Sequence, residues 1–154
     1  MDKDVQFGRI RFIRGDNGGK YPFNHSVYLA GKDTRVIIDP SCSLQKLTDL
    51  NEKDGVDQVW LSHWHEDHMG FLNLFDNCTL RISQRDFPPL DLGSLKVKVV
   101  ATPGHTPGHL SFFFPDEEIL FLGDYDLTTF GPWYGDVYSS IEQTITSIRK
   151  LKYL

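Results

Sequence analysis

Short apolar runs alternate with polar turns in the first part of the chain. We expect strands over residues 5–14, 26–30 and 34–38. Residues that favour turns follow each run, such as the Gly-Asp-Asn-Gly-Gly sequence at 15–19 and the Asp39-Pro40 pair. Three successive short strands of this kind predict a β-meander.

The spacing of apolar residues then changes from strand-like to helical. Leu44, Leu47 and Leu50 predict a helix over 43–54, with Gly55 where a C-terminal glycine belongs. We expect a buried strand at 56–61, a short helix at 70–75, a strand at 79–83 and a loop at 86–93. A helix followed by an apolar strand is typical of α/β proteins.

The C-terminal part of the chain shows both the alternating spacing of strands and the helical spacing of apolar residues. Alternation over 95–101 predicts a strand with one wet face, and the runs at 109–114 and 119–122 predict a hairpin. A helix is expected over 139–154, with Ser139 and Glu142 as a capping box. Its apolar stripe consists of Ile141, Ile145, Ile148 and Leu151. The chain is therefore β-rich, and we expect helices to cover its sheets.

Composition narrows the class of protein. The 154 residues are 40% hydrophobic and 24% charged, and we expect one domain over 1–154. A net charge of −5 argues against nucleic-acid binding, which needs a basic surface. No apolar run approaches the ~20 residues that span a bilayer, and no secretory signal is visible. Cys42 and Cys78 make no disulfide framework, so we expect a cytoplasmic protein without membrane contact.

The sequence Ser-His-Trp-His-Glu-Asp-His-Met-Gly at 62–70 directly follows a predicted strand. Alternate residues of an extended segment point the same way, so His63 and His65 can aim at one point. Asp67 and His68 can address a neighbouring point. Neutral imidazole and carboxylate suit zinc, iron, manganese or nickel. A polar loop with histidines clustered by chance is the alternative, which six histidines in the whole chain make improbable.

Further polar residues stand at the ends of other predicted strands. His105 lies between glycines and prolines in Thr-Pro-Gly-His-Thr-Pro-Gly-His at 102–109, a tightly turning loop that lets the backbone come close to a ligand. Asp124 ends the apolar run at 119–122, and Asp39 ends the run at 34–38. Solitary acids in such places usually serve a site rather than a core.

This arrangement resembles the metallo-β-lactamase superfamily along nearly the whole chain. The residues that fit its first four motifs are, in order, Asp39; His63, His65, Asp67 and His68; His105; and Asp124. The His-x-His-x-Asp-His signature is highly specific. The third motif is most similar to that of the hydroxyacylglutathione hydrolase (glyoxalase II) branch. The resemblance implies a four-layer αββα sandwich with a metal site at one edge of its two sheets.

The resemblance also implies roles for these residues. His63, His65 and His105 would bind a first metal ion, Asp67 and His68 would bind a second, and Asp124 would bridge them. We expect zinc, as one or two ions, with iron or manganese as alternatives. Asp67 would also orient the attacking hydroxide. Asp39 would hold the histidine loop through hydrogen bonds.

The implied activity is metal-dependent hydrolysis of a small-molecule ester or thioester by a metal-bound hydroxide. A metal lowers the pKa of bound water from 15.7 toward ~7 and polarises the carbonyl under attack. Three alternatives stay open. They are phosphodiester cleavage, iron-dependent oxidation of a sulfur substrate, and a metal-binding module without catalysis.

The chain departs from the family pattern at its C-terminal end. The family has a fifth motif, a histidine on a strand after a helix, and no histidine follows His109 here. We therefore expect a C-terminally shortened fold with an exposed sheet edge, from truncation or a short variant. A homo-oligomer would cover that edge.

The remaining candidates have ordinary interpretations. We expect structural roles for His109 and His25. Aromatic and acidic residues after Asp124 are candidates for a substrate cleft, with loop packing as the alternative. They are Tyr125, Asp126, Trp133 and Tyr134.

Overall fold

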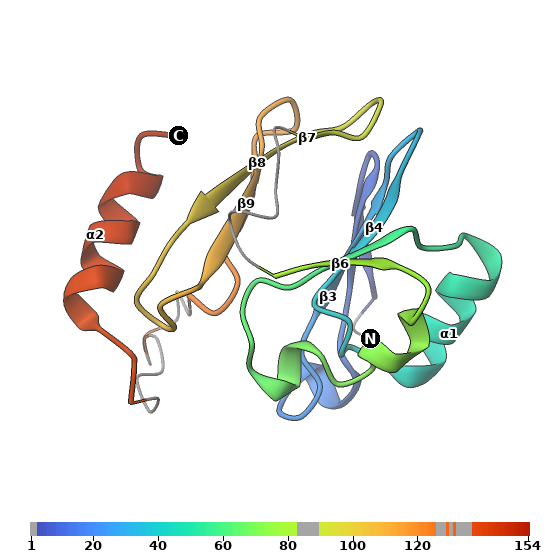
Figure 1. The fold of residues 1–154 in the computed structure, drawn as a ribbon, viewed down its shortest axis with the longest axis horizontal. Coiled ribbons are helices and arrows are strands. Elements are labelled where there is room, and N and C mark those ends of the chain that lie inside the picture. The colour runs from blue at the N-terminus through green and yellow to red at the C-terminus, as the bar shows by residue number, and fades with distance from the viewer. Residues whose placement is uncertain (1–2, 83–89, 126–128, 130, 132–136) are drawn as a thin grey trace.

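The computed structural model describes residues 3–82, 90–125, 129, 131 and 137–154. Its described strands form two sheets (Figure 1). The first has the order β1-β2-β3-β4-β5-β6, and the second has the order β10-β9-β8-β7. The first sheet contains β1 (Val5–Phe7), β2 (Ile10–Ile13), β3 (Ser26–Ala30), β4 (Arg35–Ile38), β5 (Gln58–Trp60) and β6 (Thr79–Arg81). The second contains β7 (Leu90–Asp91), β8 (Lys96–Ala101), β9 (Leu110–Phe114) and β10 (Ile119–Phe121).

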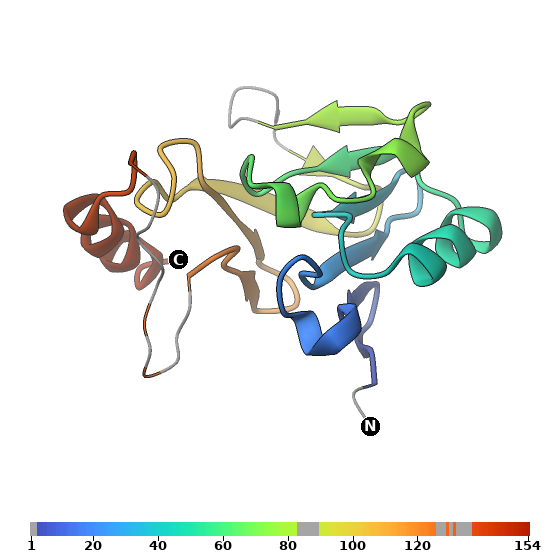
Figure 2. The same cartoon turned by 90° about the horizontal axis from the view of Figure 1, so that it is seen from below.

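Two α-helices lie outside the sheets among the described residues. Helix α1 (Leu44–Lys53) covers the first sheet, and α2 (Ile141–Leu151) lies on the side of the second sheet (Figures 1 and 2). The layers therefore run helix, sheet, sheet, helix, which confirms the expected αββα sandwich. Short 3-10 helices span Asp16–Gly19, Glu66–His68 and Leu72–Phe75. None of the described helices is long and apolar enough to cross a membrane.

Strand direction explains where the polar residues meet. Strands β1 to β4 are antiparallel, but β5 pairs with β4 in parallel, with Ile38 opposite Trp60. Helix α1 makes the crossover between these two strands. The carboxyl ends of β4 and β5 thus lie at the same edge of the sheet, and the segments that begin at Asp39 and Leu61 are neighbours.

Side-chain alternation in the first sheet fills two separate cores. In β3, Val27 and Leu29 face the second sheet, whereas Tyr28 faces α1. Leu47 and Leu50 of α1 are buried in the cluster around Tyr28, as their spacing predicted, but Leu44, expected on the same inner face, is exposed in the first turn of the helix. Between the sheets, the rings of Trp60 and Phe112 stack with their centroids 5.6 Å apart.

Several predicted boundaries were wrong in instructive ways. The run 5–14 is a hairpin, because Gly8, at φ 55°, turns the chain between Phe7 and Ile10. Residues 70–75 form only the 3-10 turn Leu72–Phe75 rather than a full helix. In the expected loop at 86–93, Leu90 and Asp91 form β7, while 86–89 lie outside the described residues.

Helix α2 differs most from expectation. Its N-cap is Ser140, whose Oγ accepts a hydrogen bond from the Gln143 N–H, and not Ser139. Ser139 Oγ instead donates to the His105 carbonyl at 2.8 Å. Of the apolar stripe, Ile141, Ile145 and Ile148 are exposed and Leu151 is half-buried, whereas the residues that α2 buries are Thr144 and Ser147.

We predict that Phe112→Ala lowers the free energy of unfolding by about 3–5 kcal/mol, because it empties the space against Trp60 in the core between the sheets. Urea denaturation measures the change. Phe7→Ala is the matched control: the residue is 50% exposed, so we expect a loss of at most about 1 kcal/mol. Equal losses at the two sites would contradict this account of the core.

Candidate metal centre

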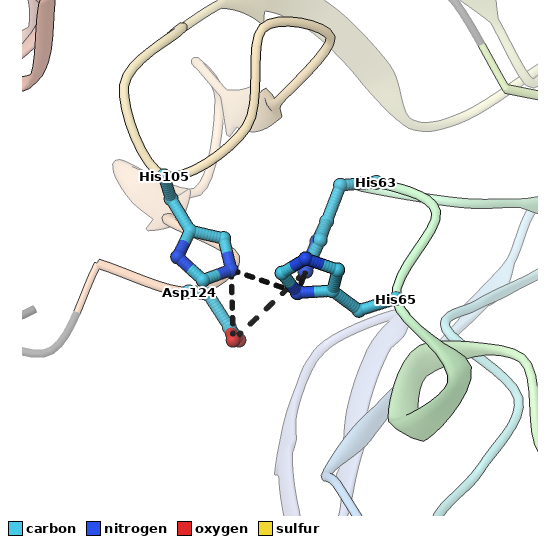
Figure 3. Close-up of side chains that lie close together, drawn as sticks. All are labelled: His63, His65, His105 and Asp124. Carbon is cyan, nitrogen blue, oxygen red and sulfur yellow. Dashed lines mark hydrogen bonds and ion pairs between the residues drawn. The ribbon is translucent and has the colours of Figure 1, made fainter. Parts of the chain in front are cut away.

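Four side chains from three loops converge at one edge of the two sheets. His63 and His65 follow β5, His105 follows β8, and Asp124 follows β10. Figure 3 shows the three imidazoles and the carboxylate pointing toward one another. The structure thus brings together four of the predicted metal ligands from both sheets.

The donor atoms are spaced as one metal ion requires. One atom from each of the four side chains lies within 4.8 Å of all the others. His65 Nδ1 is 3.1 Å from both His63 Nε2 and His105 Nε2, and Asp124 Oδ2 is 3.5 Å from His105 Nε2 and 3.9 Å from His63 Nε2. Ligand atoms about 2.0–2.1 Å from a tetrahedral zinc ion stand roughly 3.3 Å apart. The residues present therefore fit a metal ion.

The charge state of the cluster also suits a cation. Burial, with the neighbouring charge of His68, holds the pKa of His63 far below its usual value, so His63 is neutral. Burial alone would raise the pKa of Asp124, but the hydrogen bond and charge of His68 outweigh it and lower that pKa. Neutral imidazole and ionised carboxylate are the forms that bind metals.

Asp39 holds the histidine loop from beneath. Its carboxylate is fully buried and accepts hydrogen bonds from the Ser62 N–H and the Ser62 hydroxyl, both at 2.7 Å. Since the hydroxyl donates to Asp39, its 2.9 Å contact with His63 Nδ1 requires the imidazole to donate. His63 Nε2 therefore carries its lone pair toward the cluster. The expectation that Asp39 acts through hydrogen bonds is confirmed.

His68 lies between two carboxylates. Its Nδ1 is 2.9 Å from Asp39 Oδ2, and its Nε2 is 2.9 Å from Asp124 Oδ1. Burial alone would lower the pKa of His68, but the two carboxylates raise it to about 10. A cation that binds this imidazole must displace its proton.

Asp67, predicted to share a second ion with His68, is not part of the four-residue cluster. Its residue is half-buried, and its backbone carbonyl accepts a hydrogen bond from Ser41 Oγ. The structure therefore gathers His68 with Asp124 but does not bring the Asp67 carboxylate into contact with them.

His109 positions Asp124 through a one-way chain of hydrogen bonds. Ser111 Oγ donates to the Leu122 carbonyl at 3.2 Å, so at its 2.9 Å contact with Thr102 Oγ the threonine must donate. Thr102 Oγ then accepts from His109 Nδ1 at 3.0 Å. The unprotonated Nε2 is left to accept the Asp124 N–H at 3.1 Å.

Burial of the His109 ring preserves the direction of these hydrogen bonds, because it keeps the ring neutral. It lowers the pKa of His109 to about 3, with the charge of His105 adding to the effect, so the ring stays neutral at ordinary pH. A Cβ on Gly123 would lie 2.6 Å from His109 Nε2, so the turn before Asp124 packs directly on the ring. The expected structural role of His109 is confirmed, because its ring accepts a hydrogen bond from the backbone N–H of Asp124.

Sequence reasoning missed Asn24, because a lone asparagine before a strand carries no distinctive signal. Its Nδ2 lies 3.5 Å from Asp124 Oδ1 and also contacts His68. His25 has the expected structural role, since its Nδ1 accepts the Gly15 N–H. Tyr125 is buried, and its hydroxyl donates to the Thr102 carbonyl at 2.7 Å, while its side of the loop lines a small hollow against Leu120 and α2.

The other cleft candidates, Asp126, Trp133 and Tyr134, lie outside the described residues.

We predict that His109→Asn weakens metal binding about 10–100-fold, because the shorter side chain can reach Thr102 but not the Asp124 N–H. His109→Gln is the matched variant. Its Oε1 can take the place of Nε2, so its metal affinity should stay within a few-fold of the wild type. Competition with a chromophoric chelator measures both affinities. Equal losses of metal affinity in the two variants would show that the hydrogen bond to the Asp124 N–H does not determine metal binding.

Comparisons with known proteins agree with this geometry. The sequence profile described as "Metallo-beta-lactamase superfamily" matches residues 21–77 and 84–154. A hydroxyacylglutathione hydrolase of Psychromonas ingrahamii is 32% identical over 138 aligned positions, and the alignment covers 77% of this chain and 52% of the relative. An atrochrysone carboxyl ACP thioesterase of Aspergillus aculeatus is 26% identical over 177 aligned positions, covering 99% of this chain and 54% of the relative. The chain thus spans about half the length of these relatives.

Solved structures share the fold. A metallo-beta-lactamase from Pontibacter korlensis superposes with a TM-score of 0.74 at 16% identity, covering 98% of this chain and 85% of the other. The protein TTHA1623, in a di-iron-bound form, superposes with a TM-score of 0.69 at 19% identity, covering 99% of this chain and 87% of the other. At such low sequence identities, the structural similarity shows a shared fold alone.

Proposed function

The chain belongs to the metallo-beta-lactamase superfamily, and on that basis we propose that it is a metal-dependent hydrolase of small-molecule esters or thioesters. The observation that carries the proposal is the convergence of His63, His65, His105 and Asp124 within 4.8 Å. Three imidazole nitrogens and one carboxylate fit zinc, with iron or manganese as alternatives. His68, with Asp67, is the proposed partner of Asp124 for a second ion.

Some of these side chains would bind the ion, and others position the binding residues or the attacking nucleophile. When bound, the ion supplies an activated water nucleophile near neutral pH and polarises the substrate carbonyl. Ser62 and Asp39 keep the His63 lone pair directed into the cluster that would hold the ion, and His109 keeps Asp124 in place. The Asp67 carboxylate is proposed to orient the attacking hydroxide through a hydrogen bond, in a general-base-like role.

The substrate class rests on the relatives. The names hydroxyacylglutathione hydrolase and acyl carrier protein thioesterase both describe release of an acyl group from a thiol carrier. A thioester carbonyl next to a water-activating metal fits the donor set described above. The net charge of −5 argues against phosphodiester cleavage of nucleic acids.

We predict that Asp124→Asn lowers metal affinity and hydrolysis of a small acyl thioester on the order of 100-fold, because the amide removes the anionic donor of the site. Asp116→Asn makes the same chemical change at an exposed turn, where Asp116 pairs with Lys96, and should leave both unchanged. Metal content by elemental analysis and thiol release by a chromogenic reagent measure the two effects.

Chelation provides the second arm of this experiment. Metal-free protein should lose thioesterase activity and regain it with Zn²⁺. Activity that survives complete chelation would overturn the proposal. Activity on a phosphodiester alone, oxygen uptake with an iron-loaded sample and a sulfur substrate, or metal binding with no turnover would instead support one of the three alternatives.

A further inference from the structure

Helix α2 exposes its apolar residues and buries polar ones. Ile141, Ile145 and Ile148 are 53%, 44% and 37% exposed, whereas Thr144 and Ser147 are 1% and 4% exposed. A helix on the surface of a globular protein usually shows the opposite pattern. The exposed side chains form one continuous stripe, because their spacings of four and three residues place them on one face.

The contacts on the inner face of α2 fix this orientation. A Cβ on Gly104 would lie 2.1 Å from Thr144 Oγ1, so helix and loop approach more closely than a larger residue would permit. Ser147 Oγ donates to the Pro103 carbonyl at 2.8 Å, and the Ser140 N–H donates to the Gly104 carbonyl at 2.7 Å. Turning the isoleucines inward would break these bonds, so their exposure is built into the packing.

The stripe continues into an apolar hollow of about 230 Å³ beside the second sheet. Leu120 and Leu122 line it from β10 and the residue after it, and Ile148 and Leu151 line it from α2. Strand β10 is the edge strand of its sheet among the described residues. A continuous apolar surface next to an open sheet edge is typical of an interaction site.

The charges beside the stripe point to its occupant. Glu142 lies at the N-terminal end of α2, and Arg149 lies two helical turns further along the same flank of the stripe. If a second α2 runs antiparallel across a two-fold axis near Ile145, each Glu142 meets Arg149 of the second copy. In a parallel pair, the two-fold axis would put the charged flanks on opposite sides of the interface, and Glu142 would not meet Arg149.

We propose that α2 is the interface of a homodimer in which two copies pair their isoleucine stripes antiparallel. The two-fold axis makes the interface isologous, so the same stripe supplies both sides. Ile141 of one copy then packs near Ile148 of the other, with Ile145 at the centre. The glutamate–arginine pairs lie at the rim, where they set direction and register more than affinity.

Charge reversal tests the proposal. Sedimentation equilibrium over a roughly hundredfold concentration range should show a reversible dimer of the wild-type chain. Glu142→Arg alone and Arg149→Glu alone should each weaken the dimer roughly tenfold. The double variant E142R/R149E restores opposite charges across the axis, so its dimer should return to within a few-fold of the wild type.

The double variant distinguishes an effect on contacts between the two copies from an effect on the stability of α2. Both substitutions oppose the helix macrodipole, so the double variant should have the least stable α2 of the series. Recovery of its dimer must therefore come from contacts between copies. Ile145→Glu, at an already exposed position, should abolish the dimer while circular dichroism stays native.

Three outcomes would overturn the proposal. One is a wild-type chain that stays monomeric throughout the concentration range, which would leave the stripe to a different polypeptide segment. Another is a double variant no better than either single variant. The third is a dimer that persists in Ile145→Glu.

Discussion

A carboxylate without solvent contact lies beneath the converging histidines, and the geometry of the site depends on it. Asp39 ends β4, while Ser62 follows the neighbouring parallel strand β5. The two oxygens of Asp39 accept both hydrogen bonds that Ser62 offers, and one of them also contacts His68. A buried carboxylate that lost these partners would be left uncompensated, at a cost of several kcal/mol. The segments after the two strands are therefore held in a single arrangement.

The hydrogen bonds of Asp39 also determine which nitrogen of His63 carries the proton. Because Ser62 has one hydroxyl proton and gives it to Asp39, His63 must donate from Nδ1 and present Nε2 to the cluster. On the opposite side, the Leu122 carbonyl can only accept, so it fixes the direction of donation along the hydrogen bonds of Ser111, Thr102 and His109. One sheet thus orients an imidazole and the other orients a carboxylate, each by a buried network with a single consistent direction.

Much of this could be predicted from the sequence, because it follows from local patterns. Strand ends that finish in Asp39, His63 and Asp124 predict convergence at one edge once the two sheets pack face to face. The stacking of Trp60 on Phe112, the link from His109 to the Asp124 N–H and the role of Asn24 could not be predicted. Each joins segments distant in sequence, and neither periodicity nor composition records such a contact.

Helix α2 shows how a correct local prediction can fail in three dimensions. The spacing of Ile141, Ile145 and Ile148 predicted the helix, and the helix is there. Its orientation was set by a different requirement, the close approach of Thr144 and Ser147 to the loop that carries His105. Ser139 adds a hydrogen bond to the His105 carbonyl itself. The helix therefore braces the proposed metal loop with its polar face, and the isoleucines are left on the outside as a consequence of that contact.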